Sequence, residues 1–505
     1  MAKATVNYRR LFVYLLSANA ACGYAYWSYN LSIFNSLQIY LQTYIFPDAS
    51  TQIISLVASF LSLGAIFGAL LAIPMMNKWN RRKTMLIADV FGIIGLILTV
   101  IATLPTMLIG RIISGAVGGI NTVVIPVYLV EMSPLQMCGA TGSLSIITLE
   151  TSAFVSLAMS FAVPEAPDGT VKDQIWRILF LIPILLNIAR FLCLMFFFKH
   201  ETPFVHILNN KEGKANESLA AIFKNNVEVE YKRVKNDVVA SSLEGIVRLR
   251  DLFTRKYRRS FFIGFLVAVM QQMCGMTAVF VFSNDILARS VEDPALLSTI
   301  LGIINLAAVI ISFGIIEKFG RRFLLITGTL AMGILWLVFG LLAGIEGESH
   351  PALKILLLIW PCLFQMSLGS LTFLYISEIL PSVGVAFCIT ANWTAGFLIT
   401  QFYLSVVEHL GFSTPFFFFS ACCLATGSIF WRWMVETKGR TKSEILQNYA
   451  GIVTTYAPEP SDQSRWKAGA DEKALRPAEE MHTESPRREL EIIRKVDALK
   501  DEVES

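Results

Sequence analysis

A short charged sequence occurs twice in this chain, each time between two long apolar stretches. Two further motifs repeat in the same order at similar spacing, and Arg81 and Arg321 of the first motif lie 240 positions apart. The three pairs are Asn-Lys-Trp-Asn-Arg-Arg at 77–82 with Glu-Lys-Phe-Gly-Arg-Arg at 317–322, Glu-Met-Ser-Pro at 131–134 with Glu-Ile-Leu-Pro at 378–381, and Glu-Thr at 201–202 with Glu-Thr at 436–437. This ordered repetition indicates a duplicated membrane protein, an organisation typical of transporters.

The apolar stretches predict the fold class. The chain has 505 residues, of which 54% are hydrophobic and only 16% charged, whereas a soluble chain carries about 25% charged residues. About 20 apolar residues suffice for a helix to cross a bilayer. Twelve candidate membrane helices fall at 11–38, 52–76, 84–104, 107–130, 139–162, 175–199, 259–287, 296–316, 322–345, 352–376, 384–409 and 414–435. We therefore predict an all-α multi-pass membrane protein with twelve transmembrane helices in two six-helix halves.

Basic residues predict the orientation of the chain in the membrane. Lys and Arg gather in the loops of one side, as at 78–83 and 318–322, while the loops of the other side are short and mostly acidic. The basic side is expected to face the cytoplasm, together with both termini. The predicted domains are a cytoplasmic N-terminus (1–10), an N-terminal six-helix half (11–199), cytoplasmic linker helices (200–258), a C-terminal six-helix half (259–436) and a charged cytoplasmic tail (437–505).

Two segments outside the membrane helices show helical periodicity. Apolar residues of the linker recur at helical spacing, which indicates short amphipathic helices under the membrane domain; they are Leu219, Ile222, Phe223, Leu243, Ile246 and Leu249. The tail after residue 450 is rich in charged residues, as solvated segments are. Its end carries one apolar stripe, formed by Ile492, Val496, Leu499 and Val503. A protein partner bound through 485–505 is the alternative to a solvated tail.

The residue types give no indication of catalysis or of nucleic-acid binding. The formal charge is only +4, and no basic run interleaved with aromatic residues is present. The eight cysteines lie in or beside apolar stretches without zinc-ligand spacing, so we expect free thiols. No Walker-type nucleotide motif is visible in the sequence. We predict no metal site, no cofactor and no enzymatic activity.

A set of motifs in order along residues 10–445 carries a family resemblance. The motifs are Gly110-Arg111, Pro-Val-Tyr-Leu-Val-Glu-Met-Ser-Pro at 126–134, Gln-Gln-Met-Cys-Gly at 271–275, Asn392-Trp393, and Val-Glu-Thr-Lys-Gly-Arg at 435–440. The set resembles the sugar porter branch of the major facilitator superfamily, most closely its facilitative glucose transporters. The resemblance implies transport of a hexose or a similar small polar solute by alternating access.

The repeated charged residues have two interpretations. Arginines at helix ends hold loops on the cytoplasmic side. The resemblance also implies a gate, in which charge-assisted bonds to the glutamates lock the cytoplasmic side. The expected gating residues are Arg81, Arg82, Arg111, Glu131, Arg321, Arg322, Glu378 and Glu436. Cys138 and Val385 stand where the family has further arginines; this indicates a thinner lock, and hence a bias toward an inward-open state or a protein that no longer cycles.

A sugar site needs neutral polar groups, because hydroxyls require donors and acceptors without net charge. Gln271 and Gln272 offer both, although such side chains also join membrane helices to one another. By resemblance, Asn305 is a cavity asparagine and Trp393 covers the apolar face of the sugar. The predicted solute-binding residues are Gln271, Gln272, Thr277, Asn305, Gln365 and Trp393.

Several positions depart from the family pattern. Ile146 replaces a cavity Gln, Thr277 an Asn, Gln365 an acidic residue, Phe373 a Trp and Gly396 a second Asn, and the tenth helix has lost its prolines around Gly369. Three hypotheses remain. The chain transports a hexose, it transports another solute such as a polyol or a disaccharide, or it is a transport-impaired sensor or a subunit of a larger membrane assembly.

The first helix bears on energy coupling. Proton-linked members of the family carry an Asp directly after a Gly-Tyr pair, and this chain has Ala25 there. With no carboxylate in the middle of that helix and no evident proton site in the membrane, uniport is favoured over symport.

The plasma membrane is favoured over an organelle membrane.

Overall fold

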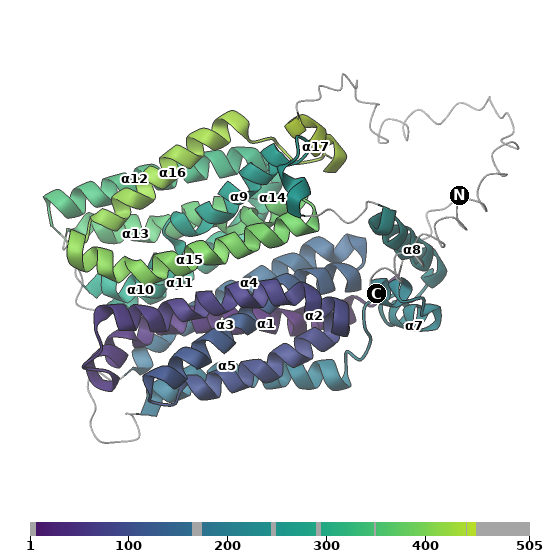
Figure 1. The fold of residues 1–505 in the computed structure, drawn as a ribbon, viewed down its shortest axis with the longest axis horizontal. Helices are drawn as coiled ribbons and strands as arrows, with labels where there is room; N and C mark the ends of the chain where they lie inside the picture. Colours follow the sequence, from purple (N-terminus) through teal and green to yellow (C-terminus); the bar gives the residue numbers. More distant parts are fainter. Residues whose placement is uncertain are drawn as a thin grey trace, which may run out of the picture.

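The computed structural model describes residues 7–163, 174–243, 249–288, 294–347, 350–440 and 442–450. Within these ranges the regular elements are helices, accompanied by an isolated bridge between Tyr8 and Phe223. Ten of the described helices are long and apolar enough to cross a membrane. The membrane helices run side by side in two groups, the purple-to-blue half and the teal-to-green half of Figure 1.

The N-terminal half builds six spans from five long helices. Its elements are α1 (Arg10–Tyr40), α2 (Thr51–Thr99), α3 (Leu104–Met132), α4 (Cys138–Ala158) with its continuation η3 (Met159–Ala162), and α5 (Ile175–Phe196). With 49 residues, α2 is long enough to cross twice, and its helical geometry is interrupted at Asn80, where φ is 65°. The second and third predicted helices are therefore the two arms of α2.

The C-terminal half supplies the other six spans, and two of these are broken. Its elements are α9 (Arg258–Met273), α10 (Met276–Ala288), α11 (Pro294–Phe319), α12 (Arg321–Ile345), α13 (Pro351–Phe364), the π-helical turn η6 (Gln365–Gly369), α14 (Ser370–Ile379), α15 (Ser382–Leu410) and α16 (Thr414–Trp433). The seventh span is α9 with α10, and the tenth is α13, η6 and α14. The predicted twelve-helix class is confirmed.

Short helices gather at one end of the bundle, which we call the linker side (Figure 1). They are α6 (Pro203–Leu208), α7 (Glu212–Ile222), α8 (Val227–Leu243), η5 (Leu249–Phe253) and α17 (Lys442–Ala450). Leu219 and Ile222 are buried, as their spacing predicts, but Leu249 is 46% exposed. The chain ahead of α1 is tied to α7, because Arg9 N donates to Ile222 O at 2.9 Å. The opposite end is called the far side below.

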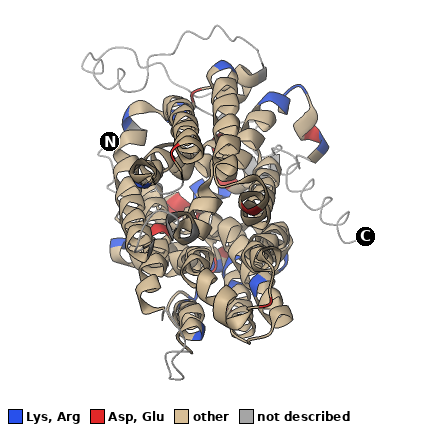
Figure 2. Ribbon diagram, turned by 90° about the vertical axis from the view of Figure 1, so that its left-hand side faces the viewer, with Lys and Arg blue, Asp and Glu red and all other residues tan. Residues whose placement is uncertain are grey.

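Small residues bring neighbouring membrane helices into backbone contact. A Cβ on Gly64 or Gly68 of α2 would lie 2.1 or 2.0 Å from a backbone oxygen of α3. This close approach is how membrane helices gain packing energy without a hydrophobic driving force between them. Viewed along the bundle in Figure 2, the helices are largely free of acidic and basic residues. The proposed partner segment 485–505 lies outside the described residues.

Candidate functional site

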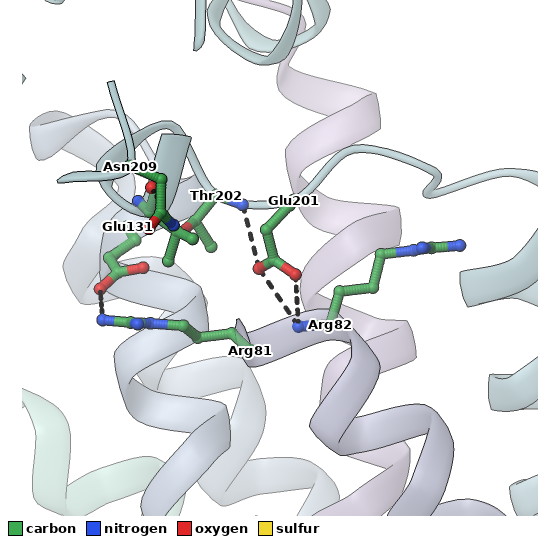
Figure 3. Close-up of polar contacts among 7 residues, drawn as sticks. Arg81, Arg82, Glu131, Glu201, Thr202 and Asn209 are labelled. Atoms are coloured by element: carbon green, nitrogen blue, oxygen red, sulfur yellow. Dashed lines mark hydrogen bonds and ion pairs between the residues drawn. The ribbon is translucent and has the colours of Figure 1, made fainter. Parts of the chain in front are cut away.

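The repeated charged motifs form two matching clusters at the linker side. In the N-terminal half, Arg81 Nη2 donates to Glu131 Oε1 at 2.8 Å (Figure 3). In the C-terminal half, Arg321 Nη2 donates to Glu378 Oε1 at 3.3 Å. The first arginine of each repeated pair therefore reaches the glutamate predicted as its partner.

The second arginine of each pair has a different task, which the sequence did not indicate. Arg82 donates from Nε and Nη2 to Leu194 O at 2.9 and 2.7 Å, near the end of α5. Arg322 donates to Trp431 O at 3.0 Å, near the end of α16. Both guanidinium groups thus satisfy carbonyls that a helix end leaves without an intrahelical partner.

A glutamate follows the last span of each half, and its carboxylate accepts hydrogen bonds from backbone N–H groups. These N–H groups belong to the residues that begin the second arm of α2 in one half and α12 in the other. Glu201 accepts from the N–H of Arg82 at 3.1 and 3.2 Å (Figure 3). Glu436 accepts from Arg321 N and Arg322 N, both at 3.0 Å. In each half this helix start follows a residue with positive φ, Asn80 or Gly320. The repeated sequence therefore encodes a repeated backbone shape.

The two equivalent carboxylates differ electrostatically. Burial raises the pKa of Glu201 above its usual range, even though backbone N–H groups hydrogen-bond to the carboxylate. Burial would also raise the pKa of Glu436, but backbone hydrogen bonds from Lys438, Arg321, Arg322 and Thr437 outweigh it and lower the pKa. Accepting several N–H bonds stabilises the ionised form. The C-terminal cluster therefore keeps its charge to lower pH.

The predicted gate residues do not form a single lock across the halves. Arg81 with Glu131, and Arg321 with Glu378, each join helices of one half, and the ion pairs described in this structure include none between the halves. Arg111 is not part of either cluster. It is buried within the N-terminal half, where it donates to Val57 O at 3.0 Å and to Asn30 O at 2.8 Å.

The halves are joined by neutral hydrogen bonds toward the far side. Asn35 Nδ2 of α1 donates to Ser283 Oγ of α10 at 2.8 Å, and Asn284 N donates to Asn35 Oδ1 at 2.9 Å. Ser59 of α2 also donates to the side chain of Gln401 of α15 at 2.7 Å. Because α1 starts at the linker side, Asn35 lies about 40 Å along it, near the far end. The far side is therefore closed by direct contacts between the halves.

Four of the residues singled out by the sequence meet where the broken seventh span packs on α15. Gln272 Nε2 donates to Asn392 Oδ1 at 3.1 Å, and Asn392 Nδ2 donates to Gln271 Oε1 at 2.9 Å. Thr277 Oγ1 donates to Gln272 Oε1. Gln271 also reaches η6, through a 3.3 Å bond to Leu368 O. The result is a buried, neutral amide cluster in the C-terminal half.

Trp393 brings this cluster to the boundary between the halves. Its ring meets that of Trp27 of α1 edge-on, with the centroids 4.7 Å apart. The ring is only 6% exposed, and its Nε1 has no hydrogen-bond partner. A buried indole N–H normally finds an acceptor, and this one is left without any in the described structure. Phe373, which stands where the family pattern has a Trp, is 39% exposed.

A second polar cluster joins the halves and contains a residue that sequence analysis missed. Glu150 of α4 is 9% exposed. Its Oε1 accepts from Gln365 Nε2 at 2.9 Å and its Oε2 accepts from Asn305 Nδ2, while Gln365 Nε2 also donates to Asn305 Oδ1 at 2.9 Å. The available signal was that Glu150 is the one acidic residue in the apolar stretch 139–162. The sequence analysis, which noted no evident proton site in the membrane, overlooked this buried carboxyl group.

The π-helical turn η6 holds Gln365 in this position. A Cβ on Gly369 would lie 2.5 Å from Gln365 Oε1, so a larger residue at 369 would force the glutamine side chain out of its present position. π-helical turns inside α-helices are frequent at functional sites. The tenth span is thus interrupted around Gly369 although the family's prolines are missing there. The interruption is the π-helical turn η6.

A second buried charge in the N-terminal half also escaped the sequence analysis. Arg190 of α5 forms an ion pair with Asp89 of α2, and both side chains have no exposed surface. Arg190 also donates to Asn121 Oδ1 at 3.2 Å. All three residues belong to one half, so this network ties its helices together rather than facing the other half.

Fold and site together define a helical membrane protein of two repeated halves with an amide-rich boundary between them. The chain belongs to the family described as sugar (and other) transporter, whose model matches residues 15–449. By its description this is a family of transporters of sugars and other solutes, not of enzymes.

Curated relatives resemble this chain along most of its length, and a solved structure shares its fold. The chain is 25% identical over 430 residues to a probable high-affinity hexose transporter of Schizosaccharomyces pombe, covering 80% of this chain and 81% of the relative. It is 26% identical over 496 residues to the high glucose sensor of Saccharomyces cerevisiae, covering 91% of this chain and 63% of the sensor. The inward-open xylose transporter of E. coli matches with a TM-score of 0.72 and 19% identity, over 86% of this chain and 99% of the other.

Proposed function

We propose that this protein carries a hexose or a similar small polar solute across its membrane by alternating access. The observation that supports this most directly is the position of Trp393. Its ring meets Trp27 at the boundary between the halves and its indole N–H is unpartnered, and the preceding residue, Asn392, belongs to the amide cluster with Gln271 and Gln272. An aromatic face with neutral amide groups nearby suits a hydroxyl-rich, uncharged ligand. Asn305, Gln365 and Thr277 complete the proposed site.

The proposed cycle uses both sets of contacts between helices. The far-side bonds of Asn35 close one entrance, and the linker-side clusters of Arg81 and Arg321 keep each half rigid as the halves rock. The linker side is taken as cytoplasmic, because its loops are basic. We propose uniport in the plasma membrane. With Ala25 at the family's proton site, α1 has no carboxylate. A test of proton coupling therefore has to include a substitution of the buried Glu150.

Uptake of labelled hexose into proteoliposomes tests the proposal. The full-length chain should give saturable uptake, and Gln271→Ala should abolish most of it, because the amide holds Asn392 and reaches η6. Gln52→Ala removes the same amide from an exposed position and serves as the matched control. Equal uptake by the two variants would refute the proposed site.

A second function, sensing or a structural role without transport, has one observation in its favour. The similarity to a yeast glucose sensor spans 91% of this chain. In that case the reconstituted protein shows no uptake, yet a sugar raises its thermal stability, since a ligand stabilises the state that binds it. A subunit role predicts instead that stoichiometric partners co-purify and are lost on deleting residues 485–505.

Thermal stability measurements can also identify the solute. A thermal-shift panel of hexoses, polyols and disaccharides ranks the candidates directly. The replacements at Ile146 and Gly396 make two positions of the site less polar than in the family pattern. The strongest stabilising solute then becomes the substrate for the uptake assays.

A further inference from the structure

We propose that Glu150 is the solute-binding residue of the N-terminal half and that it accepts hydrogen bonds from two adjacent hydroxyl groups of the solute. The inference rests on the proposed transport function and specifies the chemistry of its site. It assigns a vicinal diol as the feature that the N-terminal half recognises. The residues that carry the argument are Glu150, Asn305 and Gln365.

The geometry is that of a carboxylate with one donor on each oxygen. Gln365 Nε2 donates to Oε1 at 2.9 Å, and Asn305 Nδ2 donates to Oε2. Both donors come from the C-terminal half, from η6 and α11, whereas Glu150 stands on α4 of the N-terminal half. The three side chains form a closed triangle, since Gln365 also donates to Asn305 at 2.9 Å.

The chemistry of this triangle matches a diol. An ionised carboxylate is an acceptor only, and its two oxygens lie side by side. Two hydroxyls on neighbouring carbons present a pair of donors at similar spacing, so they can take the places of the two amide N–H groups. The described ion pairs include none with Glu150. A buried carboxylate without donors is strongly unfavourable, so a solute that displaces the amides has to supply both donors.

Neighbouring positions on α4 agree with this role. Ile146 lies one helical turn before Glu150, on the same face of α4. The family resemblance puts a solute-facing polar residue at position 146, and in this chain the polar group on that face stands four residues later. In the proposed site, the acceptor group of the N-terminal half therefore stands one turn further along α4 than position 146.

Binding at this point would also act on the transport cycle. The bonds of Glu150 to Asn305 and Gln365 link the two halves directly. A solute that inserts between them replaces a protein–protein link by two protein–solute links. Solute binding therefore changes the relative stability of the states in which the halves are close and apart, which is how a ligand shifts a conformational equilibrium.

Competition by deoxy sugars tests the proposal in the full-length chain in proteoliposomes. Each monodeoxy analogue of the transported hexose is measured as a competitor of labelled uptake. In the wild type, two analogues, each lacking one of two adjacent hydroxyls, should compete at least about tenfold more weakly than the parent sugar, because each lacks one hydrogen bond to the buried Glu150 carboxylate. In Glu150→Gln the loss of competition caused by removing either of these two hydroxyls should be severalfold smaller than in the wild type. The effect of removing any other hydroxyl should stay unchanged.

Three controls make the outcome decisive. Thr151→Ala removes a polar side chain of α4 that bonds only its own helix, to Ile147 O, and should keep the wild-type profile. Glu150→Asp keeps both oxygens and should keep the pattern with weaker binding. Thermal unfolding of each purified variant, with and without hexose, shows whether it is folded.

The proposal is overturned if Glu150→Gln keeps the wild-type deoxy-sugar profile, or if the affected hydroxyls are not adjacent. It is also overturned if the substitution changes all analogues equally and removes a proton flux that accompanies the sugar, since the carboxyl group then carries a proton. If the wild type takes up no sugar, the proposed transport function fails, and binding of the analogues measured by thermal shift still tests the diol site.

Discussion

Replacing Asn35 by alanine should open the far side of the protein. The substitution removes two side-chain hydrogen bonds between the halves, Asn35 Nδ2 to Ser283 Oγ at 2.8 Å and Asn284 N to Asn35 Oδ1 at 2.9 Å. The third contact, from Asn284 Nδ2 to the backbone oxygen of residue 35, needs no Asn35 side chain and is retained. The substitution therefore weakens this closure without removing it.

The size of the shift follows from these two bonds. A neutral hydrogen bond contributes about 0.5 to 1.5 kcal/mol, so the state that is closed on the far side loses about 1 to 3 kcal/mol. That difference shifts the equilibrium between the two states by about 5- to 150-fold. A wild type that populates the far-side-open state rarely should therefore populate it measurably in Asn35→Ala.

Pulsed electron resonance measures this shift directly. Spin labels at the exposed residues Ile101 and Leu410, near the far ends of α2 and α15, report the distance between the halves. Asn35→Ala should add a longer-distance population. Asn30→Ala is the matched control, because Asn30 is equally buried in α1 but its side chain bonds only its own helix, at Tyr26 O. The backbone oxygen of residue 30, which accepts from Arg111, is kept in this variant. Identical distance distributions for the two variants would refute the far-side closure.

Three further predictions follow from the structure. Gly369→Ala should lower uptake and thermal stability, because its Cβ would lie 2.5 Å from Gln365 Oε1, whereas Gly142→Ala has open space and should be neutral. Glu436 has a lowered pKa, so the stability that it contributes is present above the usual Glu pKa of about 4.3 and is lost as the pH falls toward the folded pKa. Glu436→Gln should therefore lower the melting temperature at pH 7, and more than Glu201→Gln, whose pKa is raised; equal losses would contradict this. Uniport predicts that an inward proton gradient does not drive sugar above equilibrium in proteoliposomes, in the wild type or in Glu150→Gln, and accumulation that a protonophore abolishes would disprove it.

The linker-side clusters show how far sequence analysis reached. Arg81 and Glu131 could be paired from sequence, because both stand at helix ends that the topology brings to the same side. The tasks of Arg82 and Arg322 could not, since their acceptors are backbone carbonyls, which every residue possesses. Arg111 was assigned to the gate from its motif, yet it stands 20 residues before Glu131 on the same helix, about 30 Å away.

The boundary between the halves was much less accessible to sequence analysis. Glu150 contacts residues 155 and 215 positions away in the chain, and nothing local in the apolar stretch indicates such partners. The glutamine at 365 was noted as a departure from the family pattern. Only the packing of α4 against α11 and η6 shows that it meets a carboxyl group of the other half.

The sequence by itself determined the number of spans, the two repeated halves and the family. Bilayer thickness sets the length of an apolar helix, and a repeated motif needs no three-dimensional information to be seen. Tertiary structure alone decided which polar groups face one another across the halves, and hence which ones we propose as solute-binding residues. Those contacts depend on how rigid helices pack against one another, and the sequence of α4 alone does not specify which side chains of α11 and η6 will face Glu150.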